Sequence, residues 1–438
     1  MNRLKENIFF KTTLILIIGG IITKIFGFVI RIVYTRMVGT EIISIYSLVL
    51  PTYSLLITIA TLALPTTISK LVAENKNKSL KVVSTSTFII TIINVLVVVI
   101  MLLSSKFIAM HLLKEPSTYI LLISMTLTFP IISISSIIKG YFYGKQNMVP
   151  NVVSNIAEQI IRITLIILFI PSVMEINKLY GAALLFLISL VTETISIIIN
   201  LLFLPRGVVI NKNDLLPDIE TTRDVLSISL PTVSSRIIGN IGYFFEPIIL
   251  MNLLLYSGYT NNYILSEYGA YNAYSLTILT VPSFFIIAIS SSLIPEISKY
   301  YLLKKYNIVK RRLKQALVFG LIIGLSYSII LLIWGENILY AIYKTYEGVE
   351  YIKILAPFFV LFYLESILMS YLQAINKANI TMKITIIGVL VKLLSLSILS
   401  ICHIGIYSLL IAEIINIFIV VFLNIKEVIK SLKKVYSS

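Results

Sequence analysis

The chain has 438 residues, of which 58% are hydrophobic and 13% are charged, and its mean hydropathy is +0.97. An average soluble domain carries roughly 25% charged residues, so this chain has too few to cover a water-exposed globule of its size. Its net charge of +16 lies in clusters between apolar runs, which excludes a nucleic-acid groove and predicts membrane topology. One cysteine, Cys402, and two histidines can form neither a disulfide nor a metal-ligand cluster, so we expect no metal or other cofactor.

Twelve apolar segments follow along the chain, each long enough to span a membrane, which takes roughly 20 mostly apolar residues. The first carries Lys24 and Arg31 and has no small-residue cleavage site, so we expect it to be retained rather than removed as a signal peptide. The sequence therefore predicts an all-α polytopic membrane protein with about twelve transmembrane helices. They lie near residues 10–35, 42–69, 82–104, 118–143, 150–171, 179–204, 224–254, 268–298, 313–334, 353–375, 380–402 and 405–424.

A polar stretch from Pro205 to Arg223 divides these segments into six and six. The predicted organisation is an N-terminal lobe over 1–204, a cytoplasmic linker over 205–223, a C-terminal lobe over 224–424 and a cytoplasmic tail over 425–438. The even-numbered loops and both termini hold 25 of the 36 Lys and Arg residues, whereas the odd-numbered loops hold 6. Because Lys and Arg concentrate on the cytoplasmic side, we expect both termini in the cytoplasm of a bacterial cell.

The two predicted lobes resemble each other in sequence. Pro65 and Pro295 are 230 residues apart, and each is followed by an Ile-Ser-Lys triplet. Four further matches share the same offset of 230: Tyr141 with Tyr371, Gly144 with Ala374, Gln146 with Asn376, and Arg162 with Lys392. Six intervening helices return the chain to the same side of the membrane. We therefore expect two parallel six-helix repeats, an arrangement typical of transporters with a substrate cavity between lobes.

The sequence contains no motif for catalysis, so we expect a protein that is not an enzyme. It has no nucleophile elbow, phosphate-binding glycine loop, zinc motif or paired aspartates. What remains is a set of charged residues inside apolar segments, where a charge usually faces a cavity or a partner. Glu158 precedes Arg162 by four residues, a spacing that permits an ion pair within one helix.

The candidate substrate-binding residues are cations and one amide in these segments. Lys24 and Arg31 are two helical turns apart and share one face, while Arg236 occupies the equivalent first segment of the second lobe. Guanidinium groups bind oxyanions through a planar fork, so Arg31 and Arg236 together suit a diphosphate. Arg162 and Asn240 complete the candidate set, and Glu158 and Glu246 are expected to hold Arg162 and Arg236 in place.

Three stretches resemble the stage V sporulation protein B group of polysaccharide transporters. They are Ile22-Thr23-Lys24-Ile25-Phe26-Gly27-Phe28 with the following Arg31-Ile32 and Leu64-Pro65, then Ile156 to Ile163 around Glu158 and Arg162, and finally Leu230-Pro231 to Glu246-Pro247-Ile248. This group belongs to the superfamily that also holds the multidrug and toxic compound extruders (the MATE/MOP superfamily) and the lipid II flippases. The resemblance covers about residues 10–300. The flippases of this kind usually have fourteen spans, two more than the segments found here.

The resemblance implies a flippase that moves an undecaprenyl-diphosphate-linked saccharide, such as a peptidoglycan precursor, to the outer leaflet. Its partners would be that lipid-linked substrate, the membrane lipids, and a coupling ion or the membrane potential. The group's cationic cavity corresponds to Lys24, Arg31 and Arg236 here. A cation-coupled multidrug or metabolite antiporter of the same fold is the alternative, which the scarcity of carboxylates in the first two segments disfavours. A membrane scaffold without transport would need neither repeats nor intramembrane charges.

Overall fold

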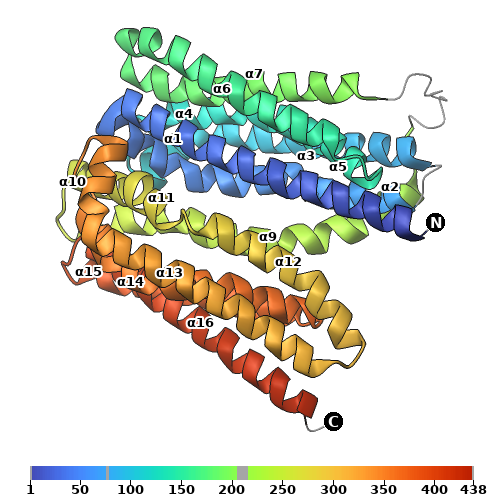
Figure 1. Ribbon diagram of the computed structural model, residues 1–438. Helices are drawn as coiled ribbons and strands as arrows, with labels where there is room; N and C mark the ends of the chain where they lie inside the picture. The colour runs from blue at the N-terminus through green and yellow to red at the C-terminus, as the bar shows by residue number, and fades with distance from the viewer. Residues whose placement is uncertain (1, 75–77, 205–215, 437–438) are drawn as a thin grey trace. The chain divides into compact units, whose positions relative to one another are not determined.

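The computed structural model describes residues 2–74, 78–204 and 216–436, and every regular element in these ranges is helical (Figure 1). Within them, ten helices are long and apolar enough to cross a membrane, and the bent pair Asn261–Leu279 with Ser283–Leu302 brings the number to eleven. This confirms the predicted all-α polytopic class. The count is lower than the twelve predicted segments because the first two segments lie in one continuous helical stretch, Gly19–Glu74.

That first stretch is too long for a single crossing. At 1.5 Å per residue, its 56 residues extend about 84 Å, nearly three times the roughly 30 Å of bilayer hydrocarbon. Helix α1 (Asn2–Thr61) is bent at Gly39, whose φ of 78° lies in the left-handed region that glycine adopts most easily. We call the parts before and after Gly39 the first and second arms of α1. The first arm contains the first predicted segment, and the second predicted segment runs from the second arm into the following helix.

A second break follows the second arm of α1. Leu62 and Ala63 have φ values of 47° and 50°, and α2 (Leu64–Glu74) begins directly after them with Pro65 in its first turn. The break leaves the Ala60 carbonyl without its helical partner, and two side chains satisfy it. Asn94 Nδ2 and the Ser133 hydroxyl donate to this oxygen at 3.1 and 2.8 Å. Polar side chains thus make the broken helix compatible with an apolar environment.

The chain forms two compact units, Met1–Phe244 and Phe245–Ser438. In the first unit, an apolar cluster that includes Leu64, Ile90, Ile137 and Val233 joins α2 to three other helices. Besides α1 and α2, the unit contains further helical elements (Figure 1). They are α3 (Ser79–Phe107), η2 (Ile108–Leu112), α4 (Thr118–Thr126), α5 (Thr128–Gly144), α6 (Val149–Ile176), α7 (Lys178–Leu202) and the first part of α9 (Ile219–Tyr256).

The second unit contains the rest of α9 and eight further elements. A broken helix is followed by four long ones, as in the first unit. The elements are α10 (Asn261–Gly269), η3 (Ala270–Ser275), α11 (Leu276–Leu279), α12 (Ser283–Leu302), α13 (Tyr306–Tyr343), α14 (Val349–Ala374), α15 (Ala378–Ile401) and α16 (Tyr407–Tyr436). The bend of 54° between α11 and α12 contains Pro282.

Helix packing repeats from one unit to the other. The pairs α6–α7, α2–α5, α5–α7 and α3–α5 of the first unit correspond to α15–α16, α12–α14, α14–α16 and α13–α14 of the second. The serines of the two Ile-Ser-Lys triplets meet the matched residues Gly144 and Ala374 at corresponding places. A Cβ on Gly144 would lie 2.9 Å from the Ser69 carbonyl oxygen, and Ser298 Oγ donates to the carbonyl of Ala374 at 2.9 Å. The sequence repeat is therefore also a repeat of packing within each unit.

Apolar side chains on the outer faces of the long helices are exposed. On α3, Leu96, Ile100 and Leu103 are 56%, 59% and 80% exposed, and α13 exposes Phe319, Ile322 and Ile333 in the same way. Contiguous apolar surface of this extent is unusual for a soluble protein. Lipid is the solvent that suits it.

Candidate functional site

A cavity of about 230 Å³ in the first unit holds two of the predicted cations, Arg31 and Arg162. The two arms of α1 form most of its wall, and α6 and α7 close it. Among its described lining residues there is no carboxylate, so the cavity has a positive character. The lining residues are Gly27, Ile30, Arg31, Tyr34, Ile43, Tyr46, Ser47, Leu50, Arg162, Leu185 and Ser189.

The helical period explains why these residues share a cavity. The first arm of α1 contributes positions 27, 30, 31 and 34, and the second arm contributes 43, 46, 47 and 50. Both sets follow the spacing i, i+3, i+4, i+7, which places side chains on one face of a helix. The bend at Gly39 separates the sets, so both faces can border one cavity.

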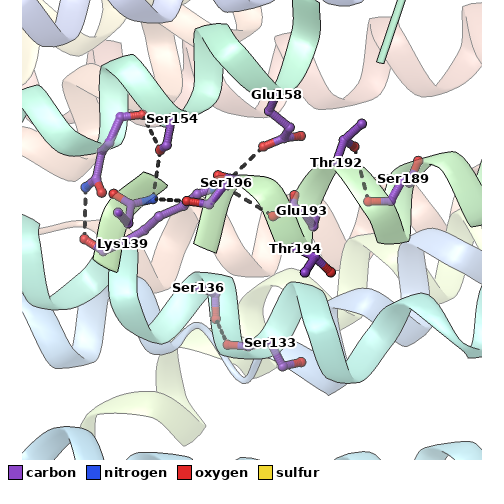
Figure 2. Close-up of polar contacts among 12 residues, drawn as sticks. Ser133, Ser136, Lys139, Ser154, Glu158, Ser189, Thr192, Glu193, Thr194 and Ser196 are labelled. Carbon is purple, nitrogen blue, oxygen red and sulfur yellow. Dashed lines mark hydrogen bonds and ion pairs between the residues drawn. The ribbon is translucent and has the colours of Figure 1, made fainter. Parts of the chain in front are cut away.

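Arg162 also belongs to a charge cluster, which we call the N-cluster. Its members are Lys139, Glu158, Arg162 and Glu193. An Arg162 terminal nitrogen lies 2.6 Å from Glu158 Oε1 and donates to Thr192 Oγ1 at 3.1 Å. Lys139 Nζ lies 3.5 Å from a carboxylate oxygen of both Glu158 and Glu193 (Figure 2). Three helices, α5, α6 and α7, supply the two cations and two carboxylates, so the charges balance. This arrangement confirms the predicted Glu158–Arg162 pair.

A second buried charge cluster, which we call the C-cluster, lies in the second unit. Lys392 Nζ on α15 lies 2.6 Å from Glu246 Oε2 on α9 and 2.5 Å from Glu413 Oε2 on α16. Glu246 is 2% exposed, and Glu365 on α14 interacts electrostatically with Glu413. The C-cluster therefore has more carboxylates than cations, in contrast to the N-cluster. Arg162 and Lys392, which match at the offset of 230, each belong to one cluster.

Three predicted site residues lie outside the lining of the cavity. Lys24 is exposed on the first arm of α1, and Arg236 is exposed on α9. Asn240 lies one turn after Arg236, where its amide nitrogen donates to the Ser54 carbonyl at 3.2 Å and to Thr58 Oγ1 at 2.7 Å. Both amide hydrogens therefore join α9 to the second arm of α1. The structure thus places Arg31 and Arg162 on one cavity and pairs Arg162 with Glu158, whereas Lys24, Arg236 and Asn240 do not line this cavity.

One predicted contact is wrong. Glu246 was expected to hold Arg236, but the structure pairs Glu246 with Lys392. Glu246 and Arg236 are ten residues apart on the same helix, about 15 Å along its axis, which is too far for an ion pair. The sequence motif that contains Arg236 and Glu246 does not include Lys392, so it could not indicate this partner.

The sequence interpretation missed several residues of the site. It singled out neither Lys139 nor the cavity-lining residues Tyr34 and Ser47. The helical spacing of Arg31 with Tyr34 was visible in the sequence. The pairing of Lys139 with Glu193 was not, because these residues are 54 positions apart and meet only through the packing of α5 against α7.

The described part of the predicted linker contacts α3 of the first unit through an ion pair between Asp218 and Lys81. Asp218 caps α9 by accepting from the Thr221 backbone N–H at 2.6 Å, and Lys81 Nζ lies 2.6 Å from its second carboxylate oxygen. The Lys81 hydrogen bond and the Thr221 N–H lower the pKa of Asp218 to about 2. The first part of the linker, residues 205–215, lies outside the described residues, as do residues 437–438 of the predicted tail.

Comparison with known proteins gives two family matches. Residues 9–301 match the family described as polysaccharide biosynthesis protein, and residues 247–399 match MatE. The chain is 35% identical over 400 residues to stage V sporulation protein B of Bacillus subtilis, covering 88% of this chain and 76% of that protein. It is 24% identical over 424 residues to the lipid II flippase MurJ of the same organism, covering 87% and 75%.

Solved structures with the same fold are transporters. A multidrug resistance MATE family transporter of the MOP superfamily, in an inward-facing conformation, has a TM-score of 0.79 at 13% identity and covers 95% of this chain and 96% of its own. A MOP superfamily transporter from Pyrococcus furiosus has a TM-score of 0.67 at 15% identity and covers 98% and 97%. At these identities the likeness establishes the fold.

Fold, buried charge clusters and comparisons together define a multi-pass membrane transporter of the MATE/MOP type rather than an enzyme. Within that superfamily, the chain belongs to the polysaccharide biosynthesis protein family.

Proposed function

We propose that the protein is a flippase that moves an undecaprenyl-diphosphate-linked saccharide across the bacterial cytoplasmic membrane by alternating access. The saccharide would be a peptidoglycan precursor or another polysaccharide unit. Membership of the polysaccharide biosynthesis family and similarity to a lipid II flippase support this substrate class. The partners would be the lipid-linked substrate and membrane lipids, with a coupling ion or the membrane potential as the source of energy.

The observation that carries the proposal is the position of Arg31 and Arg162 on one cavity without a carboxylate among its described lining residues. A diphosphate presents several oxyanion acceptors, and guanidinium groups bind such acceptors through parallel hydrogen bonds. Arg31 and Arg162 would together provide the positive charge that meets the diphosphate. In this proposal, Lys24, Arg236 and Asn240 contact the substrate outside this cavity, along the route of transfer.

We also propose the topology and the lobe boundaries that the charge distribution predicts. Both termini would be cytoplasmic, with lobes over 1–204 and 224–424, a cytoplasmic linker over 205–223 and a cytoplasmic tail over 425–438. The 25-to-6 distribution of Lys and Arg between the two sides supports this orientation. The lobes are proposed as duplicated repeats. The proposed lobe boundary at 205–223 precedes the boundary between the two compact units, which lies between Phe244 and Phe245.

One observation favours a second function, a cation-coupled antiporter. The C-cluster places Glu246 and Glu413 against a single lysine, and Glu365 interacts electrostatically with Glu413. A coupling ion needs carboxylates of this kind. An antiporter would release substrate in exchange for a proton or Na⁺ at such a group. The second candidate therefore predicts strict dependence on an imposed ion gradient.

The experiment uses purified protein in liposomes with a labelled undecaprenyl-diphosphate disaccharide, and it measures label exposed on the opposite leaflet. We expect Arg31→Ala and Arg236→Ala to abolish transfer while the protein still folds and inserts, and Arg31→Lys to retain part of it. Arg36→Ala is the matched control, because Arg36 lies on the same arm of α1 and outside the cavity lining.

Three outcomes decide between the functions. Normal transfer by both alanine variants would show that the arginines do not bind the diphosphate. Absence of transfer by the wild-type protein under every imposed gradient would exclude the flippase. Export of small cations that stops in Glu413→Gln, without any lipid transfer, would establish the antiporter.

A further inference from the structure

Helix α13 of the second unit begins with a dense set of exposed cations. Val309 and Leu313 in its first turns are 2% and 3% exposed, so they face the interior of the unit. The cations between and around them occupy the outward faces of the helix and of the turn before it. We call them the α13 cation group, and its members are Lys304, Lys305, Lys310, Arg311, Arg312 and Lys314.

Most of the α13 cation group has no counter-charge within the protein. Arg312 Nε lies 2.7 Å from Glu296 Oε1. Within the described residues, four other members form no ion pair, namely Lys304, Lys305, Arg311 and Lys314. The sequence has no Asp or Glu from position 297 to position 335. The group therefore forms a positive surface for which the second unit supplies one carboxylate.

The corresponding helix of the first unit differs at the matching position. Lys81 on α3 precedes Arg311 on α13 by the repeat offset of 230. Lys81 Nζ lies 2.6 Å from a carboxylate oxygen of Asp218, so the protein itself neutralises this cation. Arg311 forms no such pair within the part of the chain that the structure describes. The cation at this position thus has an internal partner in one repeat and is open to an external one in the other.

The sequence of α13 locates the α13 cation group relative to the bilayer. Residues 315–335 carry no charge and extend about 31 Å, which matches the roughly 30 Å of bilayer hydrocarbon. Trp334, the single tryptophan of the chain, is 51% exposed at the far end of this stretch, and tryptophan favours the interface between lipid and water. With residues 315–335 in the hydrocarbon, positions 310–314 lie within about 7 Å of its edge, in the headgroup layer.

We propose that the α13 cation group binds the headgroups of anionic phospholipids. Headgroup phosphates are the acceptors present at this level of the membrane, and clusters of Lys and Arg directly beside a spanning helix attract anionic lipids. The cations lie on an open helix surface rather than in a cavity, so they suit several neighbouring headgroups at once. This lipid surface is independent of the flippase function, because it concerns the surrounding bilayer and not the transported molecule.

Quenching of tryptophan fluorescence by lipids with brominated acyl chains tests the proposal. Phe319 is 59% exposed shortly after Lys314 on α13, so Phe319→Trp in a Trp334→Phe background reports on the lipid beside the group. In mixed vesicles, we expect brominated phosphatidylglycerol to bind there at least tenfold more strongly than brominated phosphatidylcholine, by roughly the contribution of two surface cations. Trp334 of the wild-type protein reports on the opposite end of α13 and should show no preference.

Charge removal identifies the residues responsible. The double variant Arg311→Gln with Lys314→Gln should lower the preference for phosphatidylglycerol about tenfold, and raising NaCl to about 1 M should lower it in the same direction, because salt screens exposed charges. Arg311→Lys should keep the preference, since the charge and not the guanidinium fork is needed. Lys344→Gln is the matched control, because Lys344 is an exposed cation just after the other end of α13.

Three results would overturn the lipid surface. They are equal quenching by both lipids at Phe319→Trp, a preference that the double variant leaves unchanged, and a preference that Lys344→Gln lowers as much as the double variant does. Loss of the preference in millimolar inorganic phosphate at matched ionic strength would assign the group to a free anion instead. Because leaflet transfer is not measured, none of these results bears on the flippase function, and absence of transfer would leave the lipid surface standing.

Discussion

The Arg162 guanidinium lies 2.6 Å from the carboxylate of Glu158, one turn earlier on α6. The same carboxylate is 3.5 Å from Lys139, which also reaches Glu193 at 3.5 Å. Glu158 therefore joins two cations that come from different helices. Because the N-cluster is neutral as a whole, the effect of a substitution depends on whether the remaining charges still balance.

We expect Glu158→Gln to lower the amount of folded protein more than its transport per folded molecule. Removing one partner of a buried ion pair typically costs about 3–5 kcal/mol, since a charge is left uncompensated. The double variant Glu158→Gln with Arg162→Gln should recover abundance, because Lys139 and Glu193 then remain as a balanced pair. Membrane abundance and thermal midpoint measure this. Glu175→Gln, an exposed position on the same helix, is the control, and an unstable double variant would contradict the prediction.

The C-cluster should respond unequally to loss of its cation and loss of one carboxylate. Lys392→Met leaves Glu246 and Glu413 without their common partner, so we expect a severe loss of folded protein. Glu413→Gln should be milder, because Lys392 and Glu246 remain paired at 2.6 Å. Abundance of the two variants in membranes gives the order directly. If Glu413→Gln is the more damaging change, Lys392 is not the residue that stabilises the C-cluster.

Asp218 gives the protein a pH-dependent contribution to stability outside the membrane spans. Its pKa is lowered to about 2, chiefly by the hydrogen bond from Lys81 and by the backbone N–H of Thr221. A carboxyl with a lowered pKa in the fold stabilises it above the unfolded pKa of about 3.9, and the contribution is lost as the pH falls toward 2. Hydrogen exchange at the first turn of α9 should therefore be faster in Asp218→Asn than in wild type at neutral pH. The two should converge near pH 2.

Asp224→Asn is the control for the Asp218 variant, because Asp224 is exposed in the following turn of α9. It should exchange as the wild type does across the whole pH range. A difference between Asp218→Asn and wild type that stays constant down to the lowest pH would show that the charge of Asp218 is irrelevant.

Close packing of α2 on α5 depends on Gly144. A Cβ at this position would lie 2.6 Å from Val72 Cβ, so we expect Gly144→Ala to lower the free energy of unfolding by about 1–3 kcal/mol. Gly20→Ala is the matched control, because a Cβ there would meet nothing within 4 Å. Both changes replace glycine by alanine in a helix, so the difference in thermal midpoint isolates the clash. Equal midpoints would contradict the close approach.

The topology proposal predicts opposite labelling of two loops. In a Cys402→Ser background, a cysteine at Asn262 should react with an impermeant thiol reagent in intact cells, and one at Lys304 should react only after permeabilisation. The reason is that the Lys and Arg residues from Lys299 to Lys314 mark a cytoplasmic loop, whereas the loop near Asn262 has none. Reversed labelling would overturn both the orientation and the parallel arrangement of the repeats.

Local patterns in the sequence predicted much of the fold and part of the site. Apolar segment length indicated the helical membrane class, and the spacing of Glu158 and Arg162 predicted an ion pair that the structure confirms. Both depend on residues within a few turns of each other. The breaks in helices were harder to predict. The break at Leu62–Ala63 precedes Pro65, but its partner in the second unit lies around Pro282 and not at the matching Pro295.

The sequence alone determined that the chain is a helical membrane protein with repeated packing units, because lipid solvation depends on composition and helix faces depend on local spacing. Only the tertiary structure decided which charges meet. Lys392 is 146 positions from Glu246, and Lys139 is 54 positions from Glu193, so no local pattern could pair them. Burial decided their chemistry. A lysine enclosed by helices has little water to solvate its charge, so Lys392 depends on the carboxylates of Glu246 and Glu413 that the fold brings to it.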